Sequence, residues 1–249
     1  MINNHRKCGL TLGYWIFLVG YWLFTLAFRN RMACTEARFV AMLIHMKIIL
    51  LLLVCGALSL QAEPRALFNG KDLSGWKAAD IWGNGKVEAL SNGVVSCGLG
   101  KPLTGLAYTN TFPTMSYEVK MEAMRKEGSD FFVAMTIPVE SNACTVVIGG
   151  WGGNLCGISS INFMDASENQ YSEGVALKSD IWYTLRVRVT PGLLEVFLND
   201  TLYTAKVKFE NSSAFTLRAG SDIDKTKPFG LATYETKAFW RNLTVTTVE

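Results

Sequence analysis

The sequence predicts an all-β fold, a two-sheet antiparallel sandwich preceded by a hydrophobic leader. Three observations indicate this fold. From Glu63 onward, no stretch of about a dozen residues has the apolar spacing of a helix. Apolar and polar residues instead alternate with a period of two, as in half-buried strands. Turn signals interrupt these runs about every ten residues, the spacing typical of sandwiches.

Two hydrophobic segments form the leader. Leu10–Phe28 is almost wholly apolar and has about the length of a membrane-spanning helix. The second segment follows Met46, and its Leu-rich core before a polar stretch is typical of a secretory signal peptide. We interpret 46–62 as the signal peptide and 1–45 as an upstream extension before a true start at Met46, or as a membrane anchor.

This division has consequences for location. The domain at 63–249 is expected to be exported, to the periplasm or the extracellular space. It would be anchored in a membrane only if the segment at 10–28 is a real span. The sequence leaves the oligomeric state open.

The charge and histidine content of 63–249 excludes several functions. The leader holds six of the 24 Lys and Arg residues and one of the 21 acids, which leaves 18 cationic and 20 anionic residues in the domain. No nucleic-acid partner is therefore expected. Both histidines, His5 and His45, also lie in the leader. Their absence from the domain excludes Ser-His-Asp hydrolysis and His-ligated zinc there, and we expect no metal and no cofactor.

The strands follow one another in short runs. Asn92-Gly93 favours a tight hairpin between two short strands. In Met115–Met124, Tyr117 and every second residue after it are expected on one face. Further strands are expected at Leu67-Phe68, Val87–Leu90, Val94–Cys97, Phe131–Val139, Ala143–Ile148, Trp182–Thr190, Leu194–Leu198, Leu202–Ala205 and Phe239–Val248. The runs at Phe131–Val139 and Ala143–Ile148 are nearly all apolar or β-branched, which indicates central strands.

Cys144 and Cys156 flank the glycine-rich segment Gly149–Gly153 almost symmetrically. A hairpin that turned near Gly150-Trp151 would place them roughly opposite each other. An exported domain permits a disulfide, so we consider a Cys144–Cys156 bond alongside the alternative of buried free thiols.

Several segments carry a family resemblance. The run from Leu67 to Trp76 (Leu-Phe-Asn-Gly-Lys-Asp-Leu-Ser-Gly-Trp) closely resembles the opening of the bacterial 3-keto-disaccharide hydrolase domain family. Segments similar to later family motifs occur in the same order, at Ser116–Glu122, Trp182–Val187, Leu198–Asp200, Phe229–Leu231 and Trp240–Leu243. The resemblance spans nearly all of 66–249, within a branch similar to exported proteins of planctomycete-type bacteria.

This resemblance implies a fold, a ligand and an activity. The family fold is a concanavalin-like, laminin-G-like jelly roll, in agreement with the strand pattern. The family hydrolyses glycosides whose sugar is oxidised at carbon 3, so a carbohydrate is the expected ligand. Where many members carry a Gln and then His-Gly after the Gly-Leu, this chain has Ala232–Thr236, so a family histidine is missing. The fold therefore transfers better than the catalysis, and a non-catalytic carbohydrate-binding or cell-envelope module is the alternative.

Most candidate site residues lie in the glycine-rich segment or shortly after it. Asp165 and Glu168 are the best candidates for an acid–base pair, since glycosidases use two carboxylates; a capped turn is the alternative. Trp151 stands among glycines and could stack on a sugar. Further candidates for substrate contact are Asn169, Tyr171, Tyr234 and Glu235, the last two at the position of the missing histidine.

Weaker candidates also have a structural alternative. Trp82 could stack on a sugar, whereas Trp76, Trp182 and Trp240 lie in strand-like alternation and are expected to pack in the core. Arg186 and Arg188 share a strand face that favours a solvated surface over a substrate site. Asp222 and Asp224 have a weak calcium-like spacing, but a nearby lysine favours an ordinary loop.

Overall fold

The computed structural model describes residues 44–47 and 62–248. The chain divides into two units, 1–60 and 61–249. Nearly all of the expected signal peptide and upstream extension lies outside the described residues. The described segment 44–47 is helical. Among the described residues, no helix has the length and apolarity needed to cross a bilayer.

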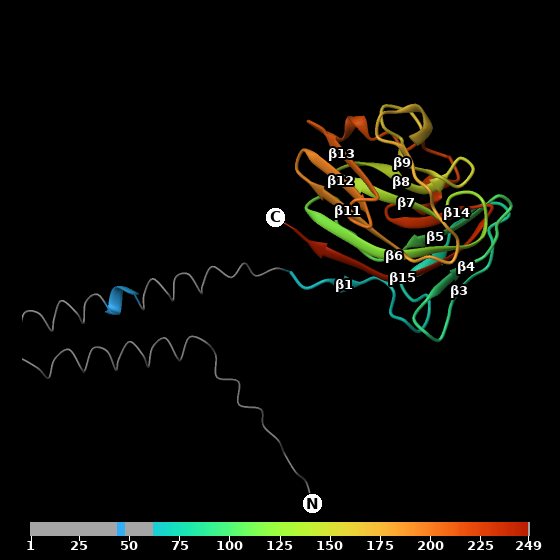
Figure 1. Cartoon of the computed structure of the whole chain (residues 1–249), viewed down its shortest axis with the longest axis horizontal. Helices are drawn as coiled ribbons and strands as arrows, with labels where there is room; N and C mark the ends of the chain where they lie inside the picture. The colour runs from blue at the N-terminus through green and yellow to red at the C-terminus, as the bar shows by residue number, and fades with distance from the viewer. Residues whose placement is uncertain (1–43, 48–61, 249) are drawn as a thin grey trace, which may run out of the picture. The chain divides into compact units, whose positions relative to one another are not determined.

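Residues 62–248 form two antiparallel sheets (Figure 1). The larger has the order β13-β12-β11-β6-β15-β4-β3, with β1 paired to β15, and the smaller has the order β10-β9-β8-β7-β14-β5-β2. The strands are β1 Arg65–Ala66, β2 Trp76–Ala78, β3 Val87–Ala89, β4 Val95–Cys97, β5 Leu103–Tyr108, β6 Tyr117–Gly128, β7 Val133–Val139, β8 Asn142–Gly150, β9 Leu155–Ser159, β10 Glu173–Gly174, β11 Tyr183–Thr190, β12 Leu193–Leu198, β13 Tyr203–Lys208, β14 Gly230–Tyr234 and β15 Thr236–Thr247. Three 3-10 turns interrupt the loops: η1 Ala166–Glu168, η2 Ser212–Ala214 and η3 Ile223–Thr226. The predicted all-β, two-sheet jelly-roll sandwich is confirmed.

The core lies between the sheets and follows the predicted alternation. On β6, Tyr117, Val119, Met121 and Ala123 are all at most 1% exposed. β7 and β8 are central strands of the smaller sheet, as expected, and β3 and β4 pair as a hairpin. Each such alternation buries one complete side-chain row, which is the main favourable term in folding.

Tryptophans anchor this core through their indole N–H groups. Trp76 donates to the Leu67 carbonyl at 2.8 Å, and Trp240 donates to the Phe132 carbonyl at 2.9 Å. Both are buried, as predicted. For Trp182 the core prediction is wrong: its ring is half-buried beneath the Arg241 guanidinium, whose centre lies 4.0 Å from the ring. A satisfied N–H lets a large aromatic enter the core without an unpaired donor.

Of the two alternatives for Cys144 and Cys156, the structure shows buried free thiols, so the disulfide hypothesis is wrong. Cys156 lies opposite Ile148 in the β8–β9 pairing, four positions from Cys144. At about 3.3 Å per residue, this places the cysteines roughly 13 Å apart, beyond the reach of about 7 Å for a disulfide. The cause is the position of the turn: the hairpin turns at residues 151–154, beyond the turn centred on Gly150 that would place the two cysteines opposite each other.

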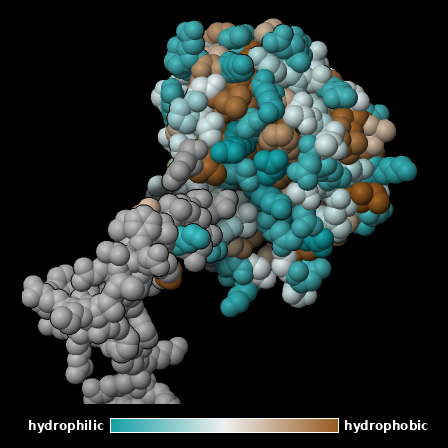
Figure 2. Space-filling view, turned by 60° about the vertical axis from the view of Figure 1, so that its left-hand side comes forward, coloured by the Kyte–Doolittle hydropathy of each residue, from teal (hydrophilic) through white to brown (hydrophobic). Residues whose placement is uncertain are grey.

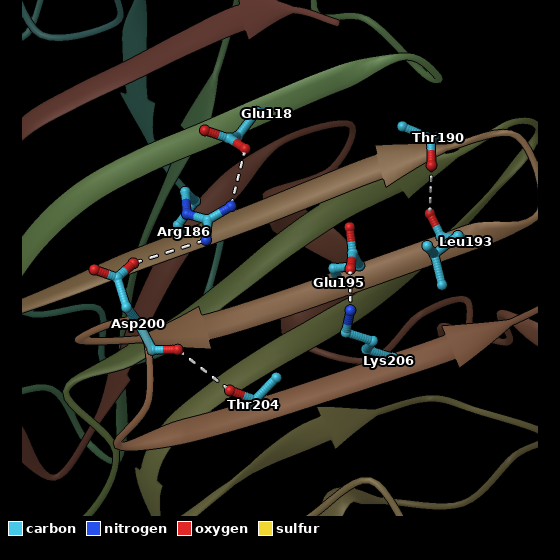
Figure 3. A network of polar contacts seen from close by, with 8 residues as sticks. All are labelled: Glu118, Arg186, Thr190, Leu193, Glu195, Asp200, Thr204 and Lys206. Atoms are coloured by element: carbon cyan, nitrogen blue, oxygen red, sulfur yellow. Dashed lines mark hydrogen bonds and ion pairs between the residues drawn. The ribbon is translucent and has the colours of Figure 1, made fainter. Parts of the chain in front are cut away.

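The outer face of the larger sheet is a network of opposite charges (Figure 3). Arg186 pairs with Glu118 at 3.3 Å and with Asp200 at 3.7 Å, and its guanidinium lies 4.0 Å from the Phe197 ring centre. Register places Arg188 on the same strand face. The contacts of Arg186 are those of a solvated sheet face. The face of the molecule shown in Figure 2 mixes hydrophilic and apolar residues.

Candidate functional site

A groove of about 1360 Å³ lies against the outer face of the smaller sheet. On β7, the core-facing positions carry large side chains such as Met135 and Ile137, whereas the outward positions carry small ones, Ala134, Thr136 and Pro138. The neighbouring β8 adds Ala143, Thr145 and Val147 to the same floor. Successive residues of a strand point to opposite faces. Because the large side chains point into the core and the small ones point outward, the outer face of these strands is hollowed and forms the floor of the groove.

Trp151 lies at one end of the groove, in the turn that joins β8 and β9. Its side chain is 47% exposed and lines the groove. Its φ is +48°, and three neighbouring glycines also have positive φ: Gly149, Gly152 and Gly153. Gly153 cannot be replaced without a clash, since a Cβ there would lie 2.4 Å from an Arg125 nitrogen. The glycine-rich run therefore allows the backbone to present the indole.

The side chains of Arg125 and Asp130 hold this turn in place through hydrogen bonds to its backbone. Arg125 is only 5% exposed, and its Nη2 donates to the carbonyls of Gly153 at 2.8 Å and Leu177 at 3.3 Å. Burial lowers the pKa of Arg125. Asp130 accepts from the Gly152 amide at 3.1 Å and from the Phe131 amide at 2.7 Å. The turn is thus fixed by a buried cation and by a carboxylate.

Phe131 and Tyr234 form an aromatic wall near Trp151. Their ring centres lie 5.6 Å apart, and the Tyr234 amide donates to the Phe131 carbonyl at 3.1 Å. Both side chains line the groove. Glu235 follows in an exposed turn with φ of +43° and is not among the residues that line the groove.

Phe163 and Asp165 lie at the opposite end. Phe163 is 87% exposed, has φ of +65° and donates its amide to Thr216 Oγ1 at 2.7 Å. The preceding Asn162 also has positive φ and donates to the Ala214 carbonyl at 2.8 Å. Left-handed backbone is costly for a bulky residue and is concentrated at functional sites. The chain is therefore held in a conformation that exposes this ring.

In the acidic turn 165–169, Asp165 and Glu168 form a capping box around η1, and only Asp165 also faces the groove. Glu168 Oε2 accepts from the Asp165 amide at 2.9 Å, and Asn169 Nδ2 donates to the carbonyls of Ile158 and Asp165, both at 2.8 Å. Neither Glu168 nor Asn169 lines the groove. The two carboxylates do not face each other across one pocket, as the two-carboxylate hypothesis requires.

Trp151 and Asp165 share the groove but lie far apart. Asp165 precedes Ala166, whose amide donates to Ser159 Oγ at 3.0 Å, whereas Trp151 follows Gly150, which pairs with Leu155. Ser159 and Leu155 are four positions apart on β9, or roughly 13 Å along the strand.

The other sequence candidates lie outside the groove. Tyr171 lines a second hollow of about 430 Å³, together with Tyr203, whose hydroxyl donates to the Tyr171 carbonyl at 2.6 Å. Trp82 is 80% exposed and lines neither hollow. Asp222 and Asp224 pair with lysines at 3.0 and 2.6 Å.

Few charged groups line the groove. Glu140 and Asp165 are its carboxylates, with Arg218 and Lys227 as cations. Glu140 Oε2 accepts from a backbone amide at 3.1 Å. The part of the chain that the structure describes holds no group of three or more His, Cys, Asp or Glu side chains suited to a metal.

Sequence reasoning missed Phe163, Arg125, Asp130 and Thr145. Thr145 is 3% exposed on the groove floor, and its hydroxyl has no hydrogen-bond partner in the described part of the chain. None of the four stands in a recognisable motif. The one available signal was the Asn-Phe pair after Ser159-Ser160, since asparagine tolerates left-handed backbone in turns.

Comparison with known proteins gives one family match. The model of the 3-keto-alpha-glucoside-1,2-lyase-like domain family matches residues 63–246. This match indicates a carbohydrate-active or carbohydrate-binding domain. No curated protein matches the chain.

Solved structures with similarity in fold are distant in sequence. The carbohydrate binding module CBM66 from Bacillus subtilis is 13% identical, with a TM-score of 0.43 over 69% of this chain and 95% of that one. A carbohydrate esterase from bacteriophage phi24B is 13% identical, with a TM-score of 0.46 over 70% and 91%. A Bacillus subtilis protein with a galectin-like fold is 11% identical, with a TM-score of 0.49 over 70% and 90%.

Proposed function

This chain belongs to the 3-keto-alpha-glucoside-1,2-lyase-like domain family, and we propose that it binds a 3-keto-glycoside in the groove and cleaves it by elimination. The observation that carries this proposal is the groove itself, with aromatic side chains at both ends and a carboxylate, Asp165, at one of them. Aromatic faces suit the apolar face of a pyranose.

The chemistry needs only one base. A ketone at carbon 3 acidifies the hydrogen on carbon 2, so a carboxylate can remove it as a proton. The electron pair of the C2–H bond then forms the C1=C2 double bond, and the bond from carbon 1 to the glycosidic oxygen breaks. The departing oxygen takes up the proton and leaves as an alcohol, so no co-reactant is needed. Addition of water to the double bond gives net hydrolysis, which links this reaction to the hydrolase activity implied by the sequence resemblance.

Asp165 is assigned as the base. Of the two carboxylates that line the groove, Glu140 accepts a backbone amide at the edge of η2, while Asp165 precedes η1. Direct hydrolysis of an unoxidised glycoside uses two flanking carboxylates, and Glu168, the intended partner, caps the turn instead. One available carboxylate therefore favours elimination over two-carboxylate hydrolysis.

Asp165→Asn tests the base, with Glu168→Gln as the matched control three residues away. Asn keeps the size of the side chain but cannot take a proton, so turnover of a 3-keto-glucoside should fall about 10²- to 10⁴-fold while binding persists. Gln retains an oxygen that can accept the Asp165 amide, so Glu168→Gln should stay near wild type. Equal losses in both variants would refute the assignment of Asp165.

The second candidate function is binding without cleavage. The missing family histidine at Ala232–Thr236 favours it. Saccharide binding by the wild-type protein with no release of alcohol from any 3-keto-glycoside would establish this alternative and exclude the lyase.

Export is part of the proposal and is supported by the signal-peptide pattern at 46–62. Fractionation of expressing cells and N-terminal sequencing of the mature chain test it. A mature protein in the periplasm or medium that begins near Glu63 is expected. A cytoplasmic protein that keeps residues 46–62 would contradict export.

A further inference from the structure

Resting on the proposed function, we infer that the groove holds an extended neutral oligosaccharide, with one sugar on Trp151 and another on Phe163. Both side chains line the same groove and are exposed, to 47% and 87%. They come from different loops, one before and one after β9. The site therefore has two separate stacking positions.

The separation of these positions sets the length of the ligand. Trp151 adjoins the Gly150–Leu155 pair, and Phe163 lies beyond the opposite end of β9, past Ser159. Leu155 and Ser159 are already roughly 13 Å apart along the strand. The groove volume of about 1360 Å³ also exceeds the upper end, near 1,000 Å³, of the usual range for small-ligand pockets. One pyranose ring cannot reach both aromatic side chains.

The backbone fixes the two rings in place. Trp151 and Phe163 have φ of +48° and +65°, so both aromatic residues are held in the left-handed region. This conformation is uncommon for bulky residues and persists only where the surroundings impose it. Arg125 and Asp130 hold the first loop, and Thr216 holds the second. Two exposed rings are fixed in this way at the two ends of one trough.

The lining between the ends indicates a neutral ligand. It holds two carboxylates, Glu140 and Asp165, and two cations, Arg218 and Lys227, and Lys227 is already paired with Asp224 at 2.6 Å, so no large excess of either charge remains. The remaining polar lining consists of hydroxyl and amide groups, which suit sugar hydroxyls: Thr114, Ser141, Asn142, Thr145, Ser159, Ser160, Ser213, Thr216, Ser221 and Tyr234. A polyanion or polycation would meet no excess of opposite charge here, whereas a neutral glycan would meet matching hydrogen-bonding groups.

Calorimetric titration of the full chain with gluco-oligosaccharides of one to six units tests this inference. Malto-, cello- and laminari-series ligands should be compared, because the linkage is open. Affinity should rise with length until both stacking positions are occupied, and then level off. Equal affinity for the monosaccharide and the hexasaccharide would overturn the inference.

Two substitutions locate the stacking positions. Trp151→Ala and Phe163→Ala should each weaken hexasaccharide binding by about tenfold, with additive effects in the double variant because the sites do not touch. Binding of a disaccharide should be weakened by only one of the two substitutions. Trp82→Ala, which removes an 80% exposed indole outside the groove, should have no effect.

The outcomes separate the inference from the proposed function. If oligosaccharides bind but neither aromatic substitution weakens them, the extended site is refuted and the proposed function stands. If no saccharide binds, with or without a ketone at carbon 3, both are refuted.

Discussion

Replacement of Thr145 by Val should stabilise the free protein and weaken its ligand complex. Thr145 is 3% exposed, and its hydroxyl lacks a hydrogen-bond partner in the described part of the chain. An unsatisfied buried polar group costs about 1–3 kcal/mol, and the valine methyl removes that cost in nearly the same shape. For a domain of this size, 1 kcal/mol corresponds to roughly 2–4 °C in Tm. A gain of about 2–12 °C in differential scanning calorimetry is therefore expected.

Thr136→Val is the matched control, because Thr136 lies beside Thr145 in the β7–β8 pairing. Its hydroxyl is buried but bonded to Thr226 Oγ1 at 2.7 Å. Valine would break that bond inside the protein, so Thr136→Val should lose about 1 kcal/mol of stability. The two substitutions are the same chemically and differ only in whether the hydroxyl has a partner, so their Tm shifts should have opposite signs.

The ligand measurement decides what the Thr145 hydroxyl does. If it bonds a bound sugar, Thr145→Val loses about 0.5–1.5 kcal/mol of binding energy, a two- to thirteenfold rise in Kd by calorimetric titration. A higher Tm with unchanged Kd would refute ligand contact. A lower Tm would refute the unsatisfied state itself.

Three further predictions concern the rest of the domain. Arg125→Met should cost about 2–4 kcal/mol in denaturant unfolding, because two charge-assisted hydrogen bonds are lost, and it should also shift the fluorescence of Trp151. Alkylation without reductant should label Cys144 and Cys156 only after denaturation, since burial raises the pKa of the first thiol and brings that of the second to about 11; a disulfide would leave both unlabelled. Hydrogen bonds from Ser74 and Asn69 lower the pKa of Asp72 from 3.8 to about 2. The contribution of Asp72 to folding stability is therefore complete above about pH 4 and is lost as the pH falls towards 2. Asp72→Asn should flatten the dependence of unfolding free energy on pH between these two values.

The sequence was sufficient for the fold because the sandwich is encoded by alternation. The β6 row from Tyr117 to Ala123 needs only a period of two to be recognised, and its burial follows from the hydrophobic effect. The β8–β9 hairpin could not be predicted to the same degree. Its ends were recognisable, but the exact position of the turn depends on the contacts that hold residues 151–154, and a turn beyond Gly150 separates Cys144 from Cys156 along the strands.

The candidate site could be predicted only in part, for a similar reason. Trp151 stood out because glycines surround it, and it does line the groove. Phe163 did not stand out, because its exposure depends on bonds from its loop to the distant segment at residues 214–216. Asp165 and Glu168 looked equivalent in sequence and share the capping box of η1, yet only Asp165 lines the groove. Short spacing brings residue types together, but it does not set the direction of their side chains.

The distance between Trp151 and Asp165 changes what each can do. If they shared one sugar, stacking and proton removal would be coupled, and loss of the indole would lower kcat as well as affinity. Because they lie at opposite ends of the trough, Trp151 contributes binding remote from the reacting carbon. Trp151→Ala should therefore raise KM for a long 3-keto-oligosaccharide and leave kcat nearly unchanged, whereas Asp165→Asn should lower kcat with little change in binding. A parallel fall of kcat in both variants would place them at one subsite and contradict the two-ended groove.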